Sequence, residues 1–311
     1  MRLTRFPRLF LLLAAGGLAG CSQNHLANPV SATPGSATGS DQALVVSTLA
    51  GQPQLVEDGL AESADPTTLD TPAGTAAAIE PLTYWRRITD VKRSFEVAFA
   101  DTDAAGRPTT AVVTLRKRLS GTFNILAGAP AEAGLPPDTA FVVHKPLEDH
   151  WVRRVLLKRL PLAAGGTDPL WRIVATSGVQ ITARDAATRI VSLRIQAASL
   201  DTTISDPLAF HRLRRILRVA PESMVTLTAT TGANDDVVVL QHADRRFRFR
   251  NNGDNTYTGV WRSGLFAPGV RHFGVNALSH GTLFDDAAPY DSQSWLFPYV
   301  LEPEQLAESM P

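Results

Sequence analysis

Two imidazoles and two carboxylates lie close together in one short stretch of the chain, at His144, Glu148, Asp149 and His150. Such groups can supply acid and base catalysis near neutral pH, and imidazole is a common ligand of transition metals. Their spacing matches no standard set of metal ligands. Loops also collect polar residues. Two interpretations follow: a candidate site built from these four side chains, or a polar loop before a strand that begins at Trp151.

A second polar group follows His280, where Asp285, Asp286 and Asp291 come close together. Carboxylate and carbonyl oxygens are the ligands that Ca²⁺ prefers, but the alternation of an EF-hand loop is missing here. Turns between strands explain the same residues. Calcium binding near Asp285 and Asp286 therefore stays open, and the sequence predicts no cofactor.

A basic stretch contains Arg212, Arg214, Arg215 and Arg218. Clustered arginines can contact the phosphates of anionic lipids. Runs of charge more often mark a solvated face, so a connector between domains is the preferred interpretation.

The familiar catalytic motifs are absent. The chain has no His-Glu-x-x-His helix, Gly-x-Ser-x-Gly elbow, Ser-x-x-Lys nucleophile or Gly-rich phosphate loop. Catalytic groups can still be scattered in sequence and meet in the fold. The leading hypothesis is a non-enzymatic binding or structural module for a protein or glycan partner. One alternative is a hydrolase of envelope polymers with its site in residues 79–205, and another is an anionic-lipid-binding protein.

Cys21 is the only cysteine, so neither an internal disulfide nor a cysteine-rich metal site can form. A basic N-terminus and a short apolar run, Leu9 to Leu18, precede it, as in a signal peptide. The residues Leu18-Ala19-Gly20-Cys21 resemble the bacterial lipobox. The resemblance implies that residues 1–20 are removed and that Cys21 is acylated. Because Ser22 follows the cysteine, it also implies an exported protein anchored in the outer membrane.

Charge is unevenly distributed along the chain. Residues 22–85 contain seven acidic side chains and no Lys or Arg, whereas residues 86–311 contain 27 basic and 23 acidic side chains. So mild a basic excess predicts no nucleic-acid partner. Residues 21–78 are rich in small and polar residues, which favours a flexible acidic tether between the lipid and the fold.

The elements expected after the tether are short strands. In residues 79–205, alternation such as Phe95, Val97 and Phe99 predicts half-buried strands, and Asp101–Arg107 is turn material. An all-β sandwich or a partly open barrel explains this region most simply. The alternative is an α+β fold with a helix near residues 75–90, where Ala76, Ala77 and Ala78 favour a helix.

A linker is expected at 206–218, a second β-sandwich at 219–304 and a tail at 305–311. Asn252 to Trp261 and Gly269 to Ala277 resemble the late strands of bacterial immunoglobulin-like modules. The resemblance implies a seven-stranded sandwich without a disulfide. The tryptophans lie in expected strands, so the core is their predicted place rather than a sugar-binding platform; they are Trp85, Trp151, Trp171, Trp261 and Trp295.

Overall fold

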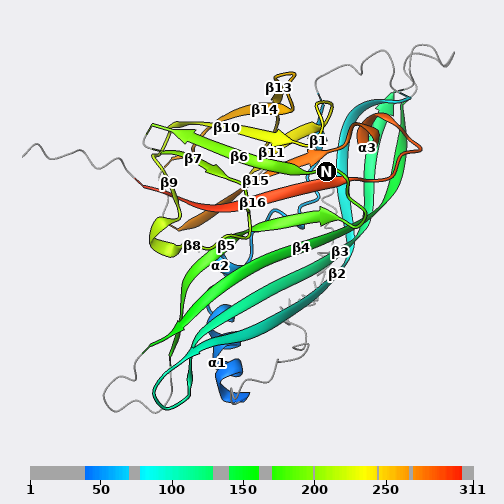
Figure 1. The fold of residues 1–311 in the computed structure, drawn as a ribbon. Coiled ribbons are helices and arrows are strands. Elements are labelled where there is room, and N and C mark those ends of the chain that lie inside the picture. Colours follow the sequence, from blue (N-terminus) through cyan, green and yellow to red (C-terminus); the bar gives the residue numbers. More distant parts are fainter. Residues whose placement is uncertain are drawn as a thin grey trace, which may run out of the picture.

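A computed structural model describes residues 39–69, 78–128, 140–160, 170–198, 200–243, 245–265 and 269–302. The expected all-β fold is confirmed, because strands form most of the described chain (Figure 1).

The helices are α1 (Gly39–Ala50), α2 (Pro53–Val56), α3 (His280–Phe284) and the 3₁₀ helix η2 (Leu213–Arg215). The strands of the first half are β1 (Thr67–Thr68), β2 (Glu80–Thr102), β3 (Pro108–Gly128), β4 (Ala140–Arg159), β5 (Trp171–Ala183), β6 (Ile190–Ala197) and β7 (Leu200–Ile204). Those of the second half are β8 (His211–Arg212), β9 (Leu217–Val219), β10 (Met224–Thr231), β11 (Val237–His242), β12 (Arg245–Arg248), β13 (Arg250–Asn251), β14 (Thr256–Arg262), β15 (Val270–Leu278) and β16 (Ser292–Leu301).

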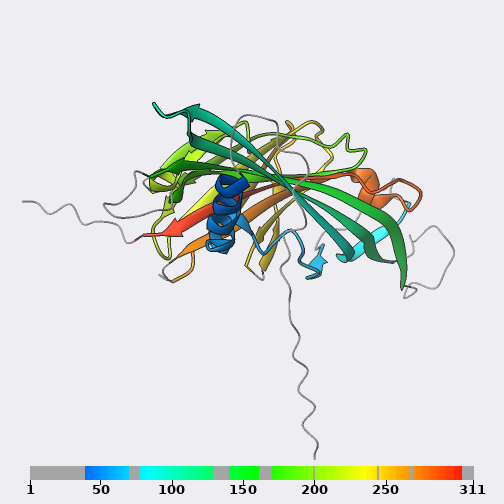
Figure 2. The same ribbon diagram turned by 90° about the horizontal axis from the view of Figure 1, so that it is seen from below.

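Two antiparallel sheets contain these strands. The larger has the order β1-β2-β3-β4-β5-β16-β15-β11-β12, with β8 added to β5 and β9 running parallel to β16. The smaller has the order β13-β14-β10-β6-β7. Four long strands, β2 to β5, project from the rest of the molecule and twist strongly (Figures 1 and 2).

The β2–β3 hairpin is built as the sequence predicts. Its turn is held by Asp103, whose side chain accepts hydrogen bonds from the backbone N–H groups of Ala105 and Arg107. Gly106 adopts φ +71°, a conformation that glycine tolerates best. Farther along the hairpin, a Cβ on Gly121 would lie 2.0 Å from the carbonyl oxygen of Arg87, so only glycine fits beside the bulge at Ile88–Asp90.

The larger sheet curls so that strands far apart in its order meet. Phe123 and Ile125 of β3 share an apolar cluster with Val239 of β11 and Leu278 of β15. At its other end, the face of β2–β5 that carries Val113, Leu115, Trp151 and Val155 forms a second cluster; we call this face the inner face. The smaller sheet packs its β6, β10 and β14 side chains on β11, β15 and β16 to make a sandwich.

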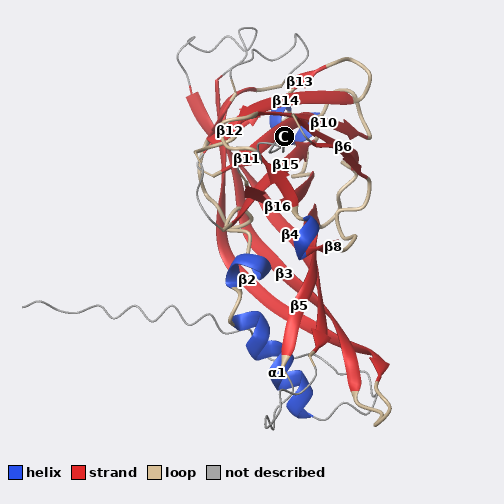
Figure 3. Ribbon diagram, turned by 90° about the vertical axis from the view of Figure 1, so that its left-hand side faces the viewer, coloured by secondary structure: helices blue, strands red, loops and turns tan. Residues whose placement is uncertain are grey.

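Part of the predicted tether is folded. Residues 39–69, here called the arm, lie along the inner face, with α1 beside the long strands and α2 nearer the sandwich (Figure 3). The arm buries apolar side chains in the inner-face cluster, namely Val45, Leu49, Leu55, Val56, Leu60 and Ala61. The prediction of a tether is therefore wrong over 39–69. The composition, rich in small and polar residues, did not reveal a helix whose stability comes from packing against the sheet rather than from its own sequence.

The linker and the α+β alternative also need correction. β6 precedes the expected boundary at 206–218 and pairs with β7 on one side, but on its other side it pairs with β10 beyond the boundary. Likewise, β16 pairs with β5. The segments assigned to 79–205 and 219–304 thus share both sheets. The helix expected near 75–90 is replaced by β2 from Glu80 onward. The signal peptide, Cys21 and the tail at 305–311 lie outside the described residues.

Candidate functional site

The four residues singled out between 144 and 150 lie in the middle of β4, not in a loop. Alternate side chains of a strand point to opposite faces. His144, Glu148 and His150 are on the outer face, whereas Asp149 is buried on the inner one. The strand therefore separates the group that the sequence brought together.

On the outer face these side chains have structural partners. The Nδ1 atom of His144 lies 2.7 Å from the amide oxygen of Asn124. Glu148 forms ion pairs with Arg118 at 2.7 Å and with Arg184 at 3.5 Å. The hydrogen bond from Arg118 lowers the pKa of Glu148, which stays a carboxylate.

On the inner side, Asp149 is fully buried against Arg86 at 3.2 Å and the hydroxyl of Tyr290 at 3.3 Å. Burial raises the pKa of Asp149, and Arg86 opposes that rise. A second guanidinium nitrogen of Arg86 donates to the carbonyl of Ala61 in the arm at 2.8 Å. This cluster ties β2, β4 and the arm together.

The segment where the sequence leaves calcium binding open, near Asp285 and Asp286, contacts the side chain of Lys145. The ammonium group of Lys145 donates hydrogen bonds to the carbonyl oxygens of Gly281, Asp285 and Ala288 at 3.1, 2.6 and 2.6 Å. These carbonyl oxygens therefore accept hydrogen bonds from a lysine of β4. Among the described residues, no cluster of His, Cys, Asp and Glu side chains suits a metal ion.

The basic stretch forms β8, η2 and β9, of which β8 pairs with β5 and β9 runs parallel to β16. All four arginines are exposed: Arg212, Arg214, Arg215 and Arg218. Arg218 is paired with Glu302. The described part of the chain contains no helix that is long and apolar enough to cross a membrane.

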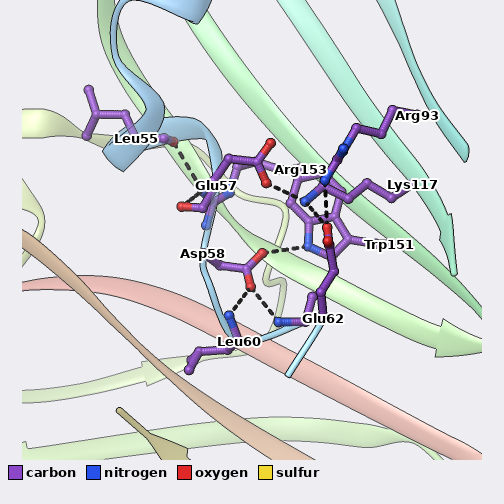
Figure 4. Close-up of polar contacts among 10 residues, drawn as sticks. Leu55, Glu57, Asp58, Leu60, Glu62, Arg93, Lys117, Trp151 and Arg153 are labelled. Carbon is purple, nitrogen blue, oxygen red and sulfur yellow. Dashed lines mark hydrogen bonds and ion pairs between the residues drawn. The ribbon is translucent and has the colours of Figure 1, made fainter. Parts of the chain in front are cut away.

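A polar network holds the second half of the arm against the inner face (Figure 4). Asp58 is its centre: its carboxylate accepts from the backbone N–H groups of Leu60 and Ala61 at 2.8 and 2.7 Å, and from the indole of Trp151 at 2.8 Å. Burial alone would raise the pKa of Asp58, but the Arg153 charge and the two backbone bonds bring it below its ordinary value. Asp58 is therefore a buried carboxylate.

Basic side chains of the inner face meet the acidic side chains of the arm. Lys117 pairs with both Glu57 and Glu62, and its ammonium lies 4.9 Å from the centre of the Trp151 ring. Arg93 reaches Glu62 at 2.9 Å. Two further pairs lie at the ends of the arm, Arg159 with Asp41 at 3.1 Å and Arg246 with Asp65 at 3.7 Å.

Arg153 is the most deeply placed cation of the network, with 0% of its surface exposed. One terminal nitrogen, Nη1, donates to the carbonyl oxygens of Leu55 and Glu57 at 3.1 and 3.4 Å. Its Nε and Nη2 atoms have no hydrogen-bond partner among the described residues. Buried donors of this kind are uncommon in folded proteins.

The sequence contained a signal for this network that the search for motifs missed. Lys117 stands between Leu115 and Leu119, and Arg153 between Trp151 and Val155, so both occupy the buried positions of alternating strands. A cation at such a position needs an anionic partner, and the acidic segment 22–85 was the available source.

A separate pocket opens at one end of the sandwich, where β11, β12 and the end of β14 meet. It encloses about 360 Å³ and is lined by Glu222, His242, Ala243, Arg245, Phe247, Trp261, Arg262, Ser263, Gly264 and Leu265. Its volume is at the lower end of the range for small-molecule sites.

Aromatic rings and cations lie together in this pocket. Trp261 packs against His242 and Phe273, with ring centres 5.6 and 5.3 Å apart. Trp261 is buried as predicted, yet it also lines the pocket, and its indole N–H has no partner among the described residues. Arg262 is paired with Glu222 at 3.4 Å, whereas Arg245 is exposed and forms no ion pair with a described residue.

Comparison of the sequence with protein-family models and curated proteins, and of the structure with solved structures, finds no match.

Proposed function

We propose that this protein is an exported lipoprotein of the bacterial envelope, anchored through Cys21, and that it binds a glycan through the sandwich pocket. The anchor is supported by the lipobox-like residues that end at Cys21. Fatty-acid labelling of the chain and of its Cys21→Ser variant tests the anchor. Equal labelling of both would contradict it.

The pocket is the observation that carries the binding proposal. The aromatic side chains of Phe247 and Trp261 give the pocket an apolar wall, against which the apolar face of a sugar ring can pack. Arg245 adds a cation that is free to contact a carboxylate. Together these groups suit a sugar residue that carries a carboxylate, such as a uronic acid.

The four residues between His144 and His150 give little support to the alternative that the protein is a hydrolase. It required His144, Glu148, Asp149 and His150 to converge, and β4 directs Asp149 away from the other three. Two groups that exchange protons with one substrate must both reach it.

Binding of methyl glucuronide, with methyl glucoside as its neutral match, tests the proposal by NMR titration. Arg245→Ala should weaken glucuronide binding by about tenfold or more, since a hydrogen bond to a charged group contributes about 1.5–3 kcal/mol and each ~1.4 kcal/mol is tenfold. Trp261→Phe should weaken binding of both sugars. The control is Arg250→Ala, an exposed arginine outside the pocket. Equal affinity of the parent, Arg245→Ala and Trp261→Phe proteins would rule the pocket out.

A further inference from the structure

The inner face has two zones that the arm covers. One zone is apolar and runs toward the β4–β5 connection, with Val113 paired to Val155 and Ala111 to Leu157 across β3 and β4. The other begins one step farther along the same strands, where Leu115 lies opposite Arg153 and Lys117 opposite Trp151. A ligand that matches this face has an apolar portion and an anionic portion at one end.

The arm itself combines an apolar portion with an anionic portion. Its α1 helix lies on the apolar zone through Val45 and Leu49, and Glu57, Asp58 and Glu62 lie at the basic zone. With 12 residues, α1 is roughly 18 Å long at ~1.5 Å per residue. That length is close to the thickness of one leaflet of a bilayer core, about 15 Å.

The arm nevertheless leaves the basic zone incompletely paired. The Nε and Nη2 atoms of Arg153 form one edge of the guanidinium, the edge that binds both oxygens of a phosphate or carboxylate side-on. Neither atom has a partner among the described residues, although the side chain is fully buried. Main-chain carbonyls of the arm satisfy only Nη1.

The ring of His272, which is near the charge of Arg153, is a second buried group with an unpaired atom. His272 of β15 has a buried Nε2 atom without a partner among the described residues. Burial and the neighbouring Arg153 charge lower the pKa of His272 to about 3, so the ring is neutral and one of its nitrogens carries a proton to donate. The nearby Asp58 acts in the opposite direction on that pKa.

We propose that the inner face is a binding site for an anionic lipid, which enters when the arm withdraws. The lipid phosphate takes the free edge of Arg153 and the ammonium of Lys117, and an acyl chain lies along the apolar zone that α1 vacates. A lipid phosphate can pair with the free edge of Arg153 while its acyl chain covers the apolar zone, whereas a small soluble anion would match the basic zone alone. The proposal does not depend on the sandwich pocket.

Lysophosphatidylglycerol below its micelle concentration is a suitable probe, and Trp151 beside Lys117 supplies a fluorescence signal. The protein is the full chain with Cys21→Ser, so that no detergent is needed. Glu57→Gln with Glu62→Gln removes the two carboxylates that pair with Lys117. This double variant should bind the probe at least tenfold more tightly than the parent, because the arm then withdraws more readily.

Adding Lys117→Met to the double variant should abolish its tighter lipid binding, since the lipid headgroup then lacks the Lys117 ammonium as a partner. The matched control is Glu96→Gln, which removes an exposed carboxylate paired with Arg116 and should bind like the parent. Lysophosphatidylcholine should bind more weakly, because its headgroup has no net charge. Inorganic phosphate alone should not displace the arm.

Hydrogen exchange of the arm supplies an independent measurement. Amides of residues 45–56 should lose protection when lysophosphatidylglycerol binds. Equal affinity across all variants, equal binding of the two lipids, the same response to phosphate alone, or binding with the arm still protected would each overturn the proposal. Variants of Trp261 and Arg245 should bind the lipid normally, so failure here is distinguishable from failure of the glycan proposal.

Discussion

At the scale of single residues, the inner face is unusual for the number of charges it buries. Arg86, Lys117, Asp149 and Arg153 are all buried on strands whose neighbouring positions are apolar. Removing one partner from a buried ionic cluster leaves an uncompensated charge in a poorly solvated place. The charges therefore make the position of the arm specific, because a shifted arm would lose several partners at once.

Asp58→Asn should lower the free energy of unfolding by about 3 kcal/mol at pH 7, since Arg153 would lose its nearest buried anion. Asp65→Asn is the matched control: Asp65 is exposed and lies 3.7 Å from Arg246, so its loss should cost less than about 1 kcal/mol. Urea unfolding of both variants measures the difference. Similar values would mean that the buried carboxylate is not what fixes the arm.

The same comparison should depend on pH. The pKa of Asp58 in the folded protein lies below its ordinary value of 3.8, so its contribution is present above that value. It is lost as the pH falls through the lower, folded pKa. The difference in stability between the parent and Asp58→Asn should therefore be constant near neutral pH and shrink in acid. A difference that grew in acid would reverse the assigned direction of the pKa shift.

At the scale of elements, alternation predicted the strands but not their length. Phe95, Val97 and Phe99 marked β2 correctly. The polar run from His144 to His150 suggests a site or a loop from sequence alone, but it is part of a strand whose outward positions are polar because they face solvent. The arm was missed for a related reason: the apolar run Ala43-Leu44-Val45-Val46 of α1 is short, and the surface that stabilises the helix comes from distant strands.

Leu49→Ala tests whether the arm is part of the fold. Leu49 is buried against the inner face, and truncating a buried leucine costs about 2–5 kcal/mol. Ser47→Ala is the control on the same helix, since Ser47 is exposed and bonds only to the carbonyl of Leu44. Thermal unfolding should show a clear drop for the first variant and almost none for the second. An unfolding midpoint for Leu49→Ala equal to that of the parent would indicate that the arm is a tether and not part of the fold.

At the scale of the whole molecule, sequence patterns located a sandwich but could not show how its sheets are shared. The partners of a strand are chosen by three-dimensional packing, and neighbours in a sheet need not be neighbours in the chain. β10 lies between β14 and β6, and β16 between β15 and β5, so each has one partner on either side of the expected linker. The network around Asp58 escaped prediction for the same reason, since Trp151 and Asp58 are far apart in sequence.

This sharing predicts the behaviour of fragments. Residues 219–304 alone should give poorly dispersed amide resonances, because β10 and β16 would each expose an unpaired edge and the cluster would lose Leu193 and Ile195 of β6. A fragment that starts at residue 186 restores β6 and β7 and should be better dispersed. A well-folded shorter fragment would show that the second sheet does not need them.

The arm also has a mechanical consequence. Its first described helix is held near the β4–β5 connection, where Asp41 contacts both Arg159 and the indole of Trp171. The sandwich lies at the opposite end of the molecule (Figure 1). If Cys21 carries the lipid, tension between membrane and protein enters the fold at Gly39 and loads the contacts of α1 along the direction of the strands. Pulling from the N-terminus should therefore detach the arm, releasing on the order of 100 Å of chain for residues 39–69, before any strand of the long hairpins separates.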